Sequence, residues 1–352
     1  MNKKVLLGMS GGVDSSVAAI LLKEQGYDVI GITMKLFEGE IEGSCCNVSS
    51  TIDAKRVCDY LNIPHYTLNF KNEFKRYVID DFITCYGNCK TPNPCIECNK
   101  YLKFGVMYKK AQEIGADYIA TGHYAKIEYS EKYNQYILKK ANAILKDQSY
   151  VLYNTPKELL DKIKLPLGDF ISKDEIRKIA SNHQLPVANK PDSEDICFIP
   201  DGNYKRFLEE NSNINNSEGN IVNINGKILG THSGLYKYTI GQRKGINISN
   251  KVPLYVVGFN KEKNELIVGE EKDLYKKEFV VSDVNWLLFE KLDKELMVNV
   301  KTRYSSKEYK ARILPKENNI KVIYNEPQKS ITPGQSAVFY IDDVIIGGGK
   351  IQ

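Results

Sequence analysis

The sequence predicts an α/β protein, with a doubly wound parallel sheet in the N-terminal half and a β-rich second half. Three observations support this. A glycine-rich segment at 8–17 joins the apolar run 5–7 to an apolar helix face at 17–22. Strand and helix patterns alternate up to residue 184, whereas short strands between turn residues follow residue 219. Alternating strands and helices are typical of parallel sheets, which bind ligands at the carboxyl ends of their strands.

Hydrophobic periodicity defines the elements of the first half. After the first strand and helix, it predicts strands over 27–34, 64–70 and 117–121 and helices over 51–61, 74–85 and 101–114. Ser172 and Glu175 form a capping box, so a further helix is expected to begin there and run through Ala180.

Turn signals define the second half. The polar segment 211–219 is a predicted linker and domain boundary. Asn225-Gly226 predicts a hairpin between 221–224 and 227–229, and a second hairpin joins 254–259 to 265–268. After Phe279, short strands are predicted over 296–303, 308–314, 319–324, 336–341 and 344–347. This number of short strands favours a small barrel or a sandwich.

Length and composition restrict the class of protein. The 352 residues suffice for two or three domains, and 42% hydrophobic and 26% charged residues are typical of soluble globular proteins. No apolar run is long enough to span a bilayer, and the chain starts directly with a strand, so we expect a cytoplasmic enzyme. A net charge of +5 permits nucleic-acid binding without indicating it. The eight cysteines, without a signal peptide, indicate catalysis, redox chemistry or metal binding rather than a disulfide framework.

The glycine-rich segment has the features of an anion site. Gly11 and Gly12 let the backbone turn tightly and approach a ligand, while the first N–H groups of the helix face the anion. Ser10, Ser15 and Ser16 add hydroxyl donors. The segment lacks the glycine–lysine pattern of the common P-loop. Its Ser-Gly-Gly-x-Asp-Ser pattern instead resembles the PP-loop of ATP pyrophosphatases, which split ATP into AMP and pyrophosphate. The alternative is a glycine turn that binds nothing.

A second group of reactive residues is Asn-Pro-Cys-Ile-Glu-Cys-Asn at 93–99. We predict a loop here, before the helix at 101–114, so Cys98 would lie near a helix N-terminus with Lys100 and Lys103 close by. Both effects favour the thiolate and make Cys98 a candidate nucleophile. One alternative is a structural zinc site that also uses Cys85, Cys89 and Cys95. A thioredoxin-like redox pair is disfavoured because the motif does not follow a strand.

Cys197 is the third candidate. Between Ile196 and Phe198 it resembles, by itself, a small core residue. Two cysteines from separate segments beside an ATP site nevertheless suit sulfur transfer, in which one carries a persulfide and the other resolves it.

Taken together, seven blocks resemble the bacterial tRNA-specific 2-thiouridylase family, in the family's order and over nearly the whole chain. They are 8–17, 93–99, 120–125 (Ala-Thr-Gly-His-Tyr-Ala), 146–150 (Lys-Asp-Gln-Ser-Tyr), 195–198 (Asp-Ile-Cys-Phe), 238–245 (Tyr-Thr-Ile-Gly-Gln-Arg-Lys-Gly) and 332–337 (Thr-Pro-Gly-Gln-Ser-Ala). The resemblance implies a PP-loop domain at 1–205, a small central β domain at 206–272 and a C-terminal antiparallel β-barrel at 273–352. It also implies ATP-dependent 2-thiolation of the wobble uridine in tRNAs for Lys, Glu and Gln.

The resemblance also implies roles for individual residues. The ATP phosphates would be held by Gly8, Met9, Ser10, Gly11, Gly12, Val13, Asp14 and Ser15, with Met34 and Gly122 bordering the adenosine. Asp14 would act through Mg²⁺ or directly on the reacting phosphate, because a carboxylate among phosphates needs a cation between them. Cys98 is the implied nucleophile and Cys197 the persulfide carrier. Asn93, Pro94 and Cys95 would border the target base, and tRNA would contact His123, Lys146, Asp147, Gln148, Arg303, Tyr304 and Gln335. The implied partners are tRNA and a persulfide donor, either a cysteine desulfurase or a sulfur relay protein.

Two departures from the family pattern keep alternatives open. Cys89-Lys90 replaces a Gly-Arg pair of many relatives, and Lys keeps the charge but not the bidentate contact. Cys95 stands where other members carry Asp, so Cys95, Cys98 and Cys197 offer a three-cysteine iron–sulfur site. We rank the persulfide first and the cluster second. Two rival functions are an ATP-dependent amide or amidine synthetase and a non-catalytic tRNA- or metal-binding protein. The paired cysteines argue against the first, and the intact glycine loop against the second.

Overall fold

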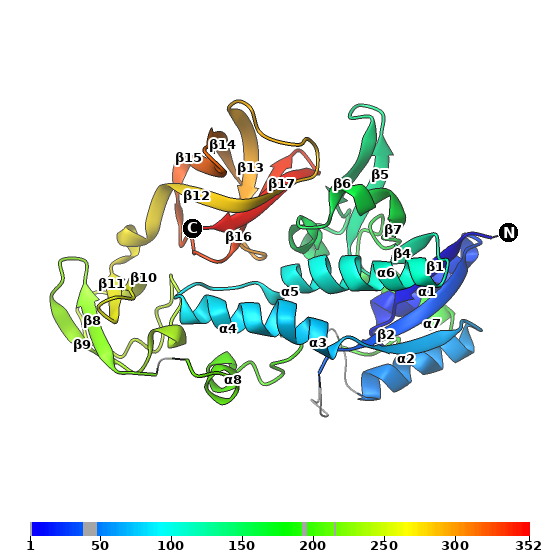
Figure 1. Ribbon diagram of the computed structural model, residues 1–352, viewed down its shortest axis with the longest axis horizontal. Helices are drawn as coiled ribbons and strands as arrows, with labels where there is room; N and C mark the ends of the chain where they lie inside the picture. Colours follow the sequence, from blue (N-terminus) through cyan, green and yellow to red (C-terminus); the bar gives the residue numbers. More distant parts are fainter. Residues whose placement is uncertain (1, 38–47, 192–195, 215) are drawn as a thin grey trace.

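The computed structural model describes residues 2–37, 48–191, 196–214 and 216–352. Cys45, Cys46 and Asp195, the first residue of the 195–198 block, lie outside this part. Figure 1 shows an α/β domain, a small sheet formed by β8–β11 and a barrel at the C-terminal end of the chain. Each helix of the described part is too short or too polar to cross a membrane.

The first domain contains a five-stranded parallel sheet with strand order β3-β2-β1-β4-β7. The strands are β1 (Lys4–Gly8), β2 (Asp28–Lys35), β3 (His65–Asn69), β4 (Tyr118–Ala120) and β7 (Ile163–Lys164). Val5 and Leu7 of β1 pack on one face, against α1 (Val13–Glu24), α2 (Val48–Tyr60) and α7 (Lys173–Asn182). Leu6 packs on the other face, against the helices of residues 71–113. This period-two alternation confirms the predicted doubly wound sheet.

Two long helical segments lie on that second face (Figure 1). The first consists of α3 (Lys71–Phe74), a π-helical turn (Lys75–Ile79) and α4 (Asp80–Gly87). The second consists of α5 (Pro94–Glu97), a nine-residue π-helical segment (Cys98–Val106) and α6 (Met107–Glu113). The predicted loop over 93–99 is therefore wrong, because the helix begins at Pro94 rather than Tyr101. Proline is favoured at the first helical position, where its missing N–H is not needed.

The alternating pattern predicted up to residue 184 misses an antiparallel hairpin after β4. Its strands are β5 (Ala125–Ser130) and β6 (Gln135–Lys140), and Lys139 of β6 pairs with Val344 of β17. Three short 3₁₀ turns follow, at Ile144–Lys146, Ser149–Leu152 and Lys157–Lys162. The hairpin therefore joins the sheet of the C-terminal barrel.

The central part begins with an unpredicted helix, α8 (Tyr204–Asn211), and continues as a four-stranded sheet of order β10-β11-β8-β9. Its strands are β8 (Gly219–Asn223), β9 (Ile228–His232), β10 (Tyr255–Asn260) and β11 (Glu265–Gly269). Both predicted hairpins are confirmed, with Gly226 at φ +80° in the first turn.

The C-terminal strands form a closed antiparallel barrel rather than a sandwich. They are β12 (Tyr275–Trp286), β13 (Leu296–Lys301), β14 (Tyr309–Lys316), β15 (Asn319–Lys329), β16 (Ser336–Ile341) and β17 (Val344–Ile351). The order is β12-β15-β14-β13-β16-β17, and pairing of β12 with β17 closes it. Closure leaves no exposed strand edge in the ring.

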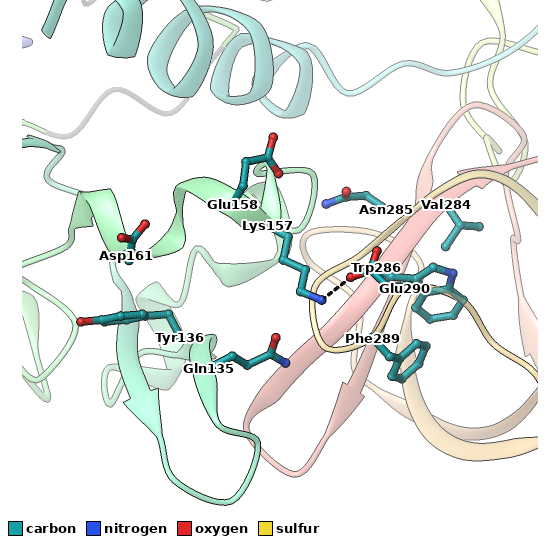
Figure 2. Close-up of a pocket in the computed structure, with 10 residues that line it drawn as sticks. All are labelled: Gln135, Tyr136, Lys157, Glu158, Asp161, Val284, Asn285, Trp286, Phe289 and Glu290. Carbon is teal, nitrogen blue, oxygen red and sulfur yellow. Dashed lines mark hydrogen bonds and ion pairs between the residues drawn. The ribbon is translucent and has the colours of Figure 1, made fainter. Parts of the chain in front are cut away.

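A groove lies where the β5–β6 hairpin meets the barrel (Figure 2). Tyr136 contributes from β6, Trp286 and Phe289 from the barrel, and Lys157 pairs with Glu290 at 2.8 Å. None of the residues predicted to bind ATP or tRNA lines this groove.

Candidate functional site

The glycine loop lies at the carboxyl end of β1, where the strand order changes direction between β2 and β4. Gly11 has φ +69°, and a Cβ there would lie 2.2 Å from the carbonyl oxygen of Ser50. A side chain at this position is therefore excluded. The hydroxyls of Ser15 and Ser16 donate to the carbonyl oxygen of Gly12, at 3.2 and 2.8 Å, and hold the turn.

The two residues predicted to border the adenosine lie on either side of this loop. Met34 is near the end of β2, and Gly122 follows β4. A Cβ on Gly122 would lie 2.9 Å from the carbonyl carbon of Asp14 and 2.9 Å from the amide nitrogen of Ser15. The chain after β4 thus touches the first turn of α1. Backbone packs directly against Gly11 and Gly122, so neither position has room for a side chain. Such bare backbone is what a loop needs if its N–H groups are to approach a bound anion.

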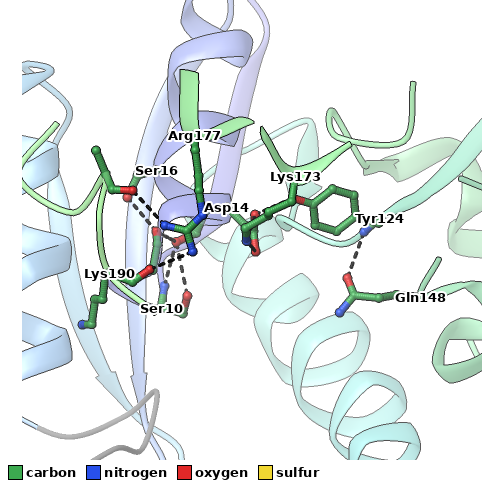
Figure 3. A network of polar contacts seen from close by, with 11 residues as sticks. Ser10, Asp14, Ser16, Tyr124, Gln148, Lys173, Arg177 and Lys190 are labelled. Atoms are coloured by element: carbon green, nitrogen blue, oxygen red, sulfur yellow. Dashed lines mark hydrogen bonds and ion pairs between the residues drawn. The ribbon is translucent and has the colours of Figure 1, made fainter. Parts of the chain in front are cut away.

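Asp14, the one acidic residue of the loop, is bound by protein groups. Lys173 Nζ lies 2.6 Å from both carboxylate oxygens, and Tyr124 donates its hydroxyl to Oδ1 at 2.6 Å (Figure 3). Sequence analysis missed Lys173 and Tyr124. In the sequence, Lys173 stands out only as a residue inside the predicted capping box of Ser172 and Glu175. In the structure, the Ser172 hydroxyl accepts a hydrogen bond from Glu175 N, as that box requires.

The described residues contain no group of three or more His, Cys, Asp or Glu side chains placed to hold a metal ion. The described residues therefore provide no preformed ligand group for the zinc alternative or for a cluster on Cys95, Cys98 and Cys197. Asp14 is paired with Lys173.

Cys98 lies in the second turn of the helix that begins at Pro94 and is half-buried. Cys197 is also half-buried, and both side chains pack against one hydrophobic cluster. Phe198 lies within this cluster, with its ring 5.6 Å from that of Phe74 and 5.3 Å from that of Phe82. The fold therefore brings the two distant cysteine segments to one core region.

Among the described residues, no cysteine is part of a disulfide bond; these cysteines are Cys58, Cys85, Cys89, Cys95, Cys98 and Cys197. Cys95 is exposed. Burial, reinforced by Asp81, raises the pKa of Cys85 to about 11, and burial also raises the pKa of Cys89. High thiol pKa values make Cys85 and Cys89 poor nucleophiles.

The segment before Cys98 is bound to the barrel. Gln335 Nε2 donates to the carbonyl oxygens of Thr91 and Pro92, at 3.0 and 3.1 Å. Lys350 of β17 lies 3.0 Å from the buried carboxylate of Glu97. Burial lowers the pKa of Lys350, but Glu97 and Asp81 outweigh this and raise it overall. The C-terminal barrel thus positions the helix that carries the candidate nucleophile.

We expect Lys350→Met to destabilise the protein by about 1–3 kcal/mol, because it leaves the Glu97 carboxylate buried without its cation. Denaturant unfolding measures the loss in the free energy of unfolding. The control is Lys310→Met, at an exposed position of β14. Adding Glu97→Gln to Lys350→Met should recover part of the loss. Equal stability of Lys350→Met and Lys310→Met would show that the ion pair does not hold the segment.

The predicted tRNA-contacting residues fall into two groups. His123 is buried, with Nδ1 2.7 Å from Thr121 Oγ1 and Nε2 3.3 Å from Lys103 Nζ. Burial, and then Lys103, lower its pKa well below the usual value, so the ring is neutral. Gln148 accepts from Tyr124 N at 2.9 Å. Asp147 accepts hydrogen bonds from Ala141 N and Ser149 N. The first group therefore makes hydrogen bonds within the protein; it consists of His123, Asp147, Gln148 and Gln335.

Lys146 and Tyr304, by contrast, are exposed. Partial burial raises the pKa of Tyr304, with Asp147 and Cys95 acting in the same direction and Lys146 against it. These charges therefore gather around Tyr304, beside the segment predicted to border the base. Arg303 is half-buried and donates from Nη2 to the carbonyl oxygen of Ile240 at 3.0 Å, which joins the barrel to the central domain.

Three family profiles match successive parts of the chain. The tRNA methyl transferase HUP domain matches residues 3–201, the tRNA methyl transferase PRC-barrel domain residues 205–270 and the aminomethyltransferase β-barrel domain residues 276–351. The chain is 50% identical to the tRNA-specific 2-thiouridylase MnmA of Caldicellulosiruptor saccharolyticus, over 100% of this chain and 99% of the relative. It is also 50% identical to MnmA of Clostridioides difficile, with the same coverage of both chains.

Solved structures give weaker matches. The U34-tRNA thiolase NcsA from Methanococcus maripaludis with its 4Fe–4S cluster is 25% identical, with a TM-score of 0.34 over 60% of this chain and 68% of that chain. A 4-thiouridine synthetase–RNA complex with bound ATP is 18% identical, with a TM-score of 0.33 over 59% of this chain and 50% of that chain. TM-scores this low carry no argument about the present protein.

Proposed function

Because the chain belongs to the tRNA-specific 2-thiouridylase family, a family of tRNA sulfurtransferases, we propose that it uses ATP and a cysteine persulfide to 2-thiolate the wobble uridine of tRNAs for Lys, Glu and Gln. The observation that best supports the mechanism is the glycine loop, which is packed too tightly at Gly11 to accept a side chain, together with two half-buried cysteines that pack on one hydrophobic cluster. An amide or amidine synthetase needs no such cysteine pair.

Activation of the uridine comes first. The C2 carbonyl is a poor electrophile, and its oxygen is a poor leaving group. We propose that this oxygen attacks the α-phosphate of ATP, forming a P–O bond while pyrophosphate leaves toward the glycine loop. Residues 8–15 hold the phosphates, and Met34 and Gly122 border the adenosine. Mg²⁺ is expected to enter with ATP, held by phosphates and water rather than by a dedicated protein cage.

Sulfur transfer follows. The terminal sulfur of a persulfide on Cys197 attacks C2, the C2–O bond breaks and AMP leaves. The Cys98 thiolate then attacks Sγ of Cys197, which cleaves the S–S bond and leaves the sulfur on C2. A transient Cys98–Cys197 disulfide forms, and a dithiol reductant restores both thiols. The persulfide itself comes from a cysteine desulfurase or a sulfur relay protein.

The tRNA site is proposed around the cysteines, where Cys95 is exposed, Asn93 is half-buried and Pro94 is buried at the start of α5. Asn93, Pro94 and Cys95 border the base, which must leave its stack to reach C2. Lys146 and Tyr304 offer a cation and an aromatic face to the RNA. His123, Asp147, Gln148, Arg303 and Gln335 are assigned here by the family resemblance, and their internal bonds indicate that they shape the surface. Closure of these segments would exclude water from the adenylate.

We expect tRNA affinity to fall as salt rises, because lysines and arginines release counterions from phosphates. Three phosphate contacts would lose roughly 20- to 40-fold between 50 and 200 mM salt. Replacing exposed Arg243 and Lys244 with Ala should flatten this dependence, whereas Lys227→Ala on the hairpin turn should not. Fluorescence anisotropy with labelled tRNA measures it. Affinity indifferent to salt would contradict a phosphate-dominated interface.

The second candidate is the same reaction through an iron–sulfur cluster on Cys95, Cys98 and Cys197. The third cysteine favours it, but the described residues do not place the three side chains as one metal-holding group. Cys95→Asp separates the two mechanisms, because Asp is a poor ligand for soft iron–sulfur coordination. With iron removed and persulfide supplied, we expect wild type and Cys95→Asp to thiolate tRNA at similar rates. Activity in neither, restored only to wild type by iron and sulfide, would establish the cluster instead.

A further inference from the structure

The glycine loop lacks the positive charge that its proposed ligand requires. Residues 8–17 contain no Lys or Arg, and their one charged side chain is Asp14. Backbone N–H groups and a helix dipole favour an anion, but a triphosphate carries several negative charges. In the common P-loop a lysine of the loop itself reaches the phosphates. Here any side-chain cation that assists the Mg²⁺ entering with ATP must come from another part of the fold.

The structure places one such cation at the start of α7. Lys173 Nζ bonds to both oxygens of Asp14, at the first turn of α1, and lies 5.8 Å from the ring centre of Tyr124. Its side chain is only 11% exposed. Ile176 and Ala180 of α7 share a core with Val13 and Val17 of α1, so the two helices are fixed together.

A second lysine lies against the other side of the loop. Lys190 Nζ is 3.1 Å from the carbonyl oxygen of Gly11 and 2.7 Å from Asp53 Oδ2. Arg177 of α7 donates to the carbonyl oxygens of Ala188 and Lys190, at 3.0 and 3.1 Å, and holds this segment in place. Figure 3 shows Lys173 and Lys190 on opposite sides of Asp14.

We propose that Lys173 and Lys190 are the phosphate-binding cations of the ATP site, an inference that rests on the proposed use of ATP. An ammonium group has three donors, so it can bond to a carboxylate and to a phosphate oxygen together. Asp14 is then a positioning residue that aims Lys173 at the phosphates. This explains how a carboxylate is tolerated in the cradle without a protein-held metal.

Titration calorimetry of the full-length protein with ATP, and separately with adenosine, tests the proposal. For Lys173→Met and for Lys190→Met we expect the dissociation constant for ATP to rise about tenfold or more, the usual effect of losing a charge-assisted hydrogen bond. The affinity for adenosine, which carries no phosphate, should stay at the wild-type value. The matched control is Lys178→Met, at an exposed position of the same helix, which should bind both ligands as wild type does.

The positioning role of Asp14 has its own readout. If Asp14 acts by orienting Lys173, adding Asp14→Asn to Lys173→Met should weaken ATP binding little further, and Lys173→Arg should retain part of the affinity. If Asp14 instead binds a metal ion independently of Lys173, the losses of ATP affinity caused by Asp14→Asn and by Lys173→Met should multiply in the double variant. That result would overturn the positioning role of Asp14.

The outcomes distinguish this inference from the proposed function. Wild-type affinity for ATP in folded Lys173→Met and Lys190→Met would overturn the inference, as would equal losses for ATP and adenosine. A wild-type protein that binds no ATP would instead overturn the proposed use of ATP.

Discussion

Cys98→Ser and Cys197→Ser are each expected to abolish 2-thiouridine formation, with the rate of thiolation falling by roughly a thousandfold or more. A serine hydroxyl forms neither a thiolate nor a persulfide near neutral pH. Both variants should still bind tRNA and ATP, since neither substitution touches the glycine loop. The measurement is quantification of 2-thiouridine in digested tRNA by mass spectrometry.

The two variants should differ in whether residue 197 carries persulfide sulfur. Cys98→Ser should still accept sulfur from a persulfide donor on Cys197, which peptide mass spectrometry detects as an added sulfur atom. Cys197→Ser should carry none there. Cys85→Ser is the matched control, because burial and Asp81 raise the pKa of Cys85 to about 11 and make it a poor nucleophile. Wild-type thiolation by Cys98→Ser would remove Cys98 from the mechanism.

The second large effect is expected for Gly122→Ala, which should lower tRNA-dependent pyrophosphate release by roughly a hundredfold. The added Cβ would lie 2.9 Å from backbone atoms of Asp14 and Ser15, so the first turn of α1 must move away from the phosphates. A 1 Å displacement in an active site is enough for an effect of this size.

Gly87→Ala is the control for this substitution. Gly87 ends α4, and a Cβ there meets nothing within 4 Å. Alanine at this position should leave pyrophosphate release unchanged. If Gly122→Ala also releases pyrophosphate at the wild-type rate, the approach of the two segments does not shape the nucleotide site.

Local sequence signals predicted those elements whose burial is decided locally. The alternation of Val5, Leu6 and Leu7 across β1 and the turn at Gly226 are examples. The β5–β6 hairpin was not predicted, because it joins the sheet of the barrel through β17, which lies some two hundred residues away in sequence. The start of the helix at Pro94 was missed because the cysteine motif was interpreted as a loop, although proline favours the first helical turn.

The candidate site shows the same division. The glycine loop is a contiguous motif, so its residues could be named from the sequence. Lys173 and Tyr124 meet Asp14 from segments more than 100 residues away, and Gln335 reaches Thr91 from the barrel. Such pairs depend on how the helices and the barrel dock, which no local pattern in one sequence records.

The central claim is that this chain thiolates the wobble uridine at the expense of ATP. The most direct measurement incubates unmodified tRNA for Lys, Glu or Gln with the protein, a persulfide donor and ATP, and then counts 2-thiouridine, AMP and pyrophosphate. The account predicts one AMP and one pyrophosphate for each 2-thiouridine at the wobble position, and none of the three products from tRNA in which that uridine is replaced by cytidine. Thiolation that proceeds without ATP, or ATP cleavage to ADP and phosphate, would contradict it.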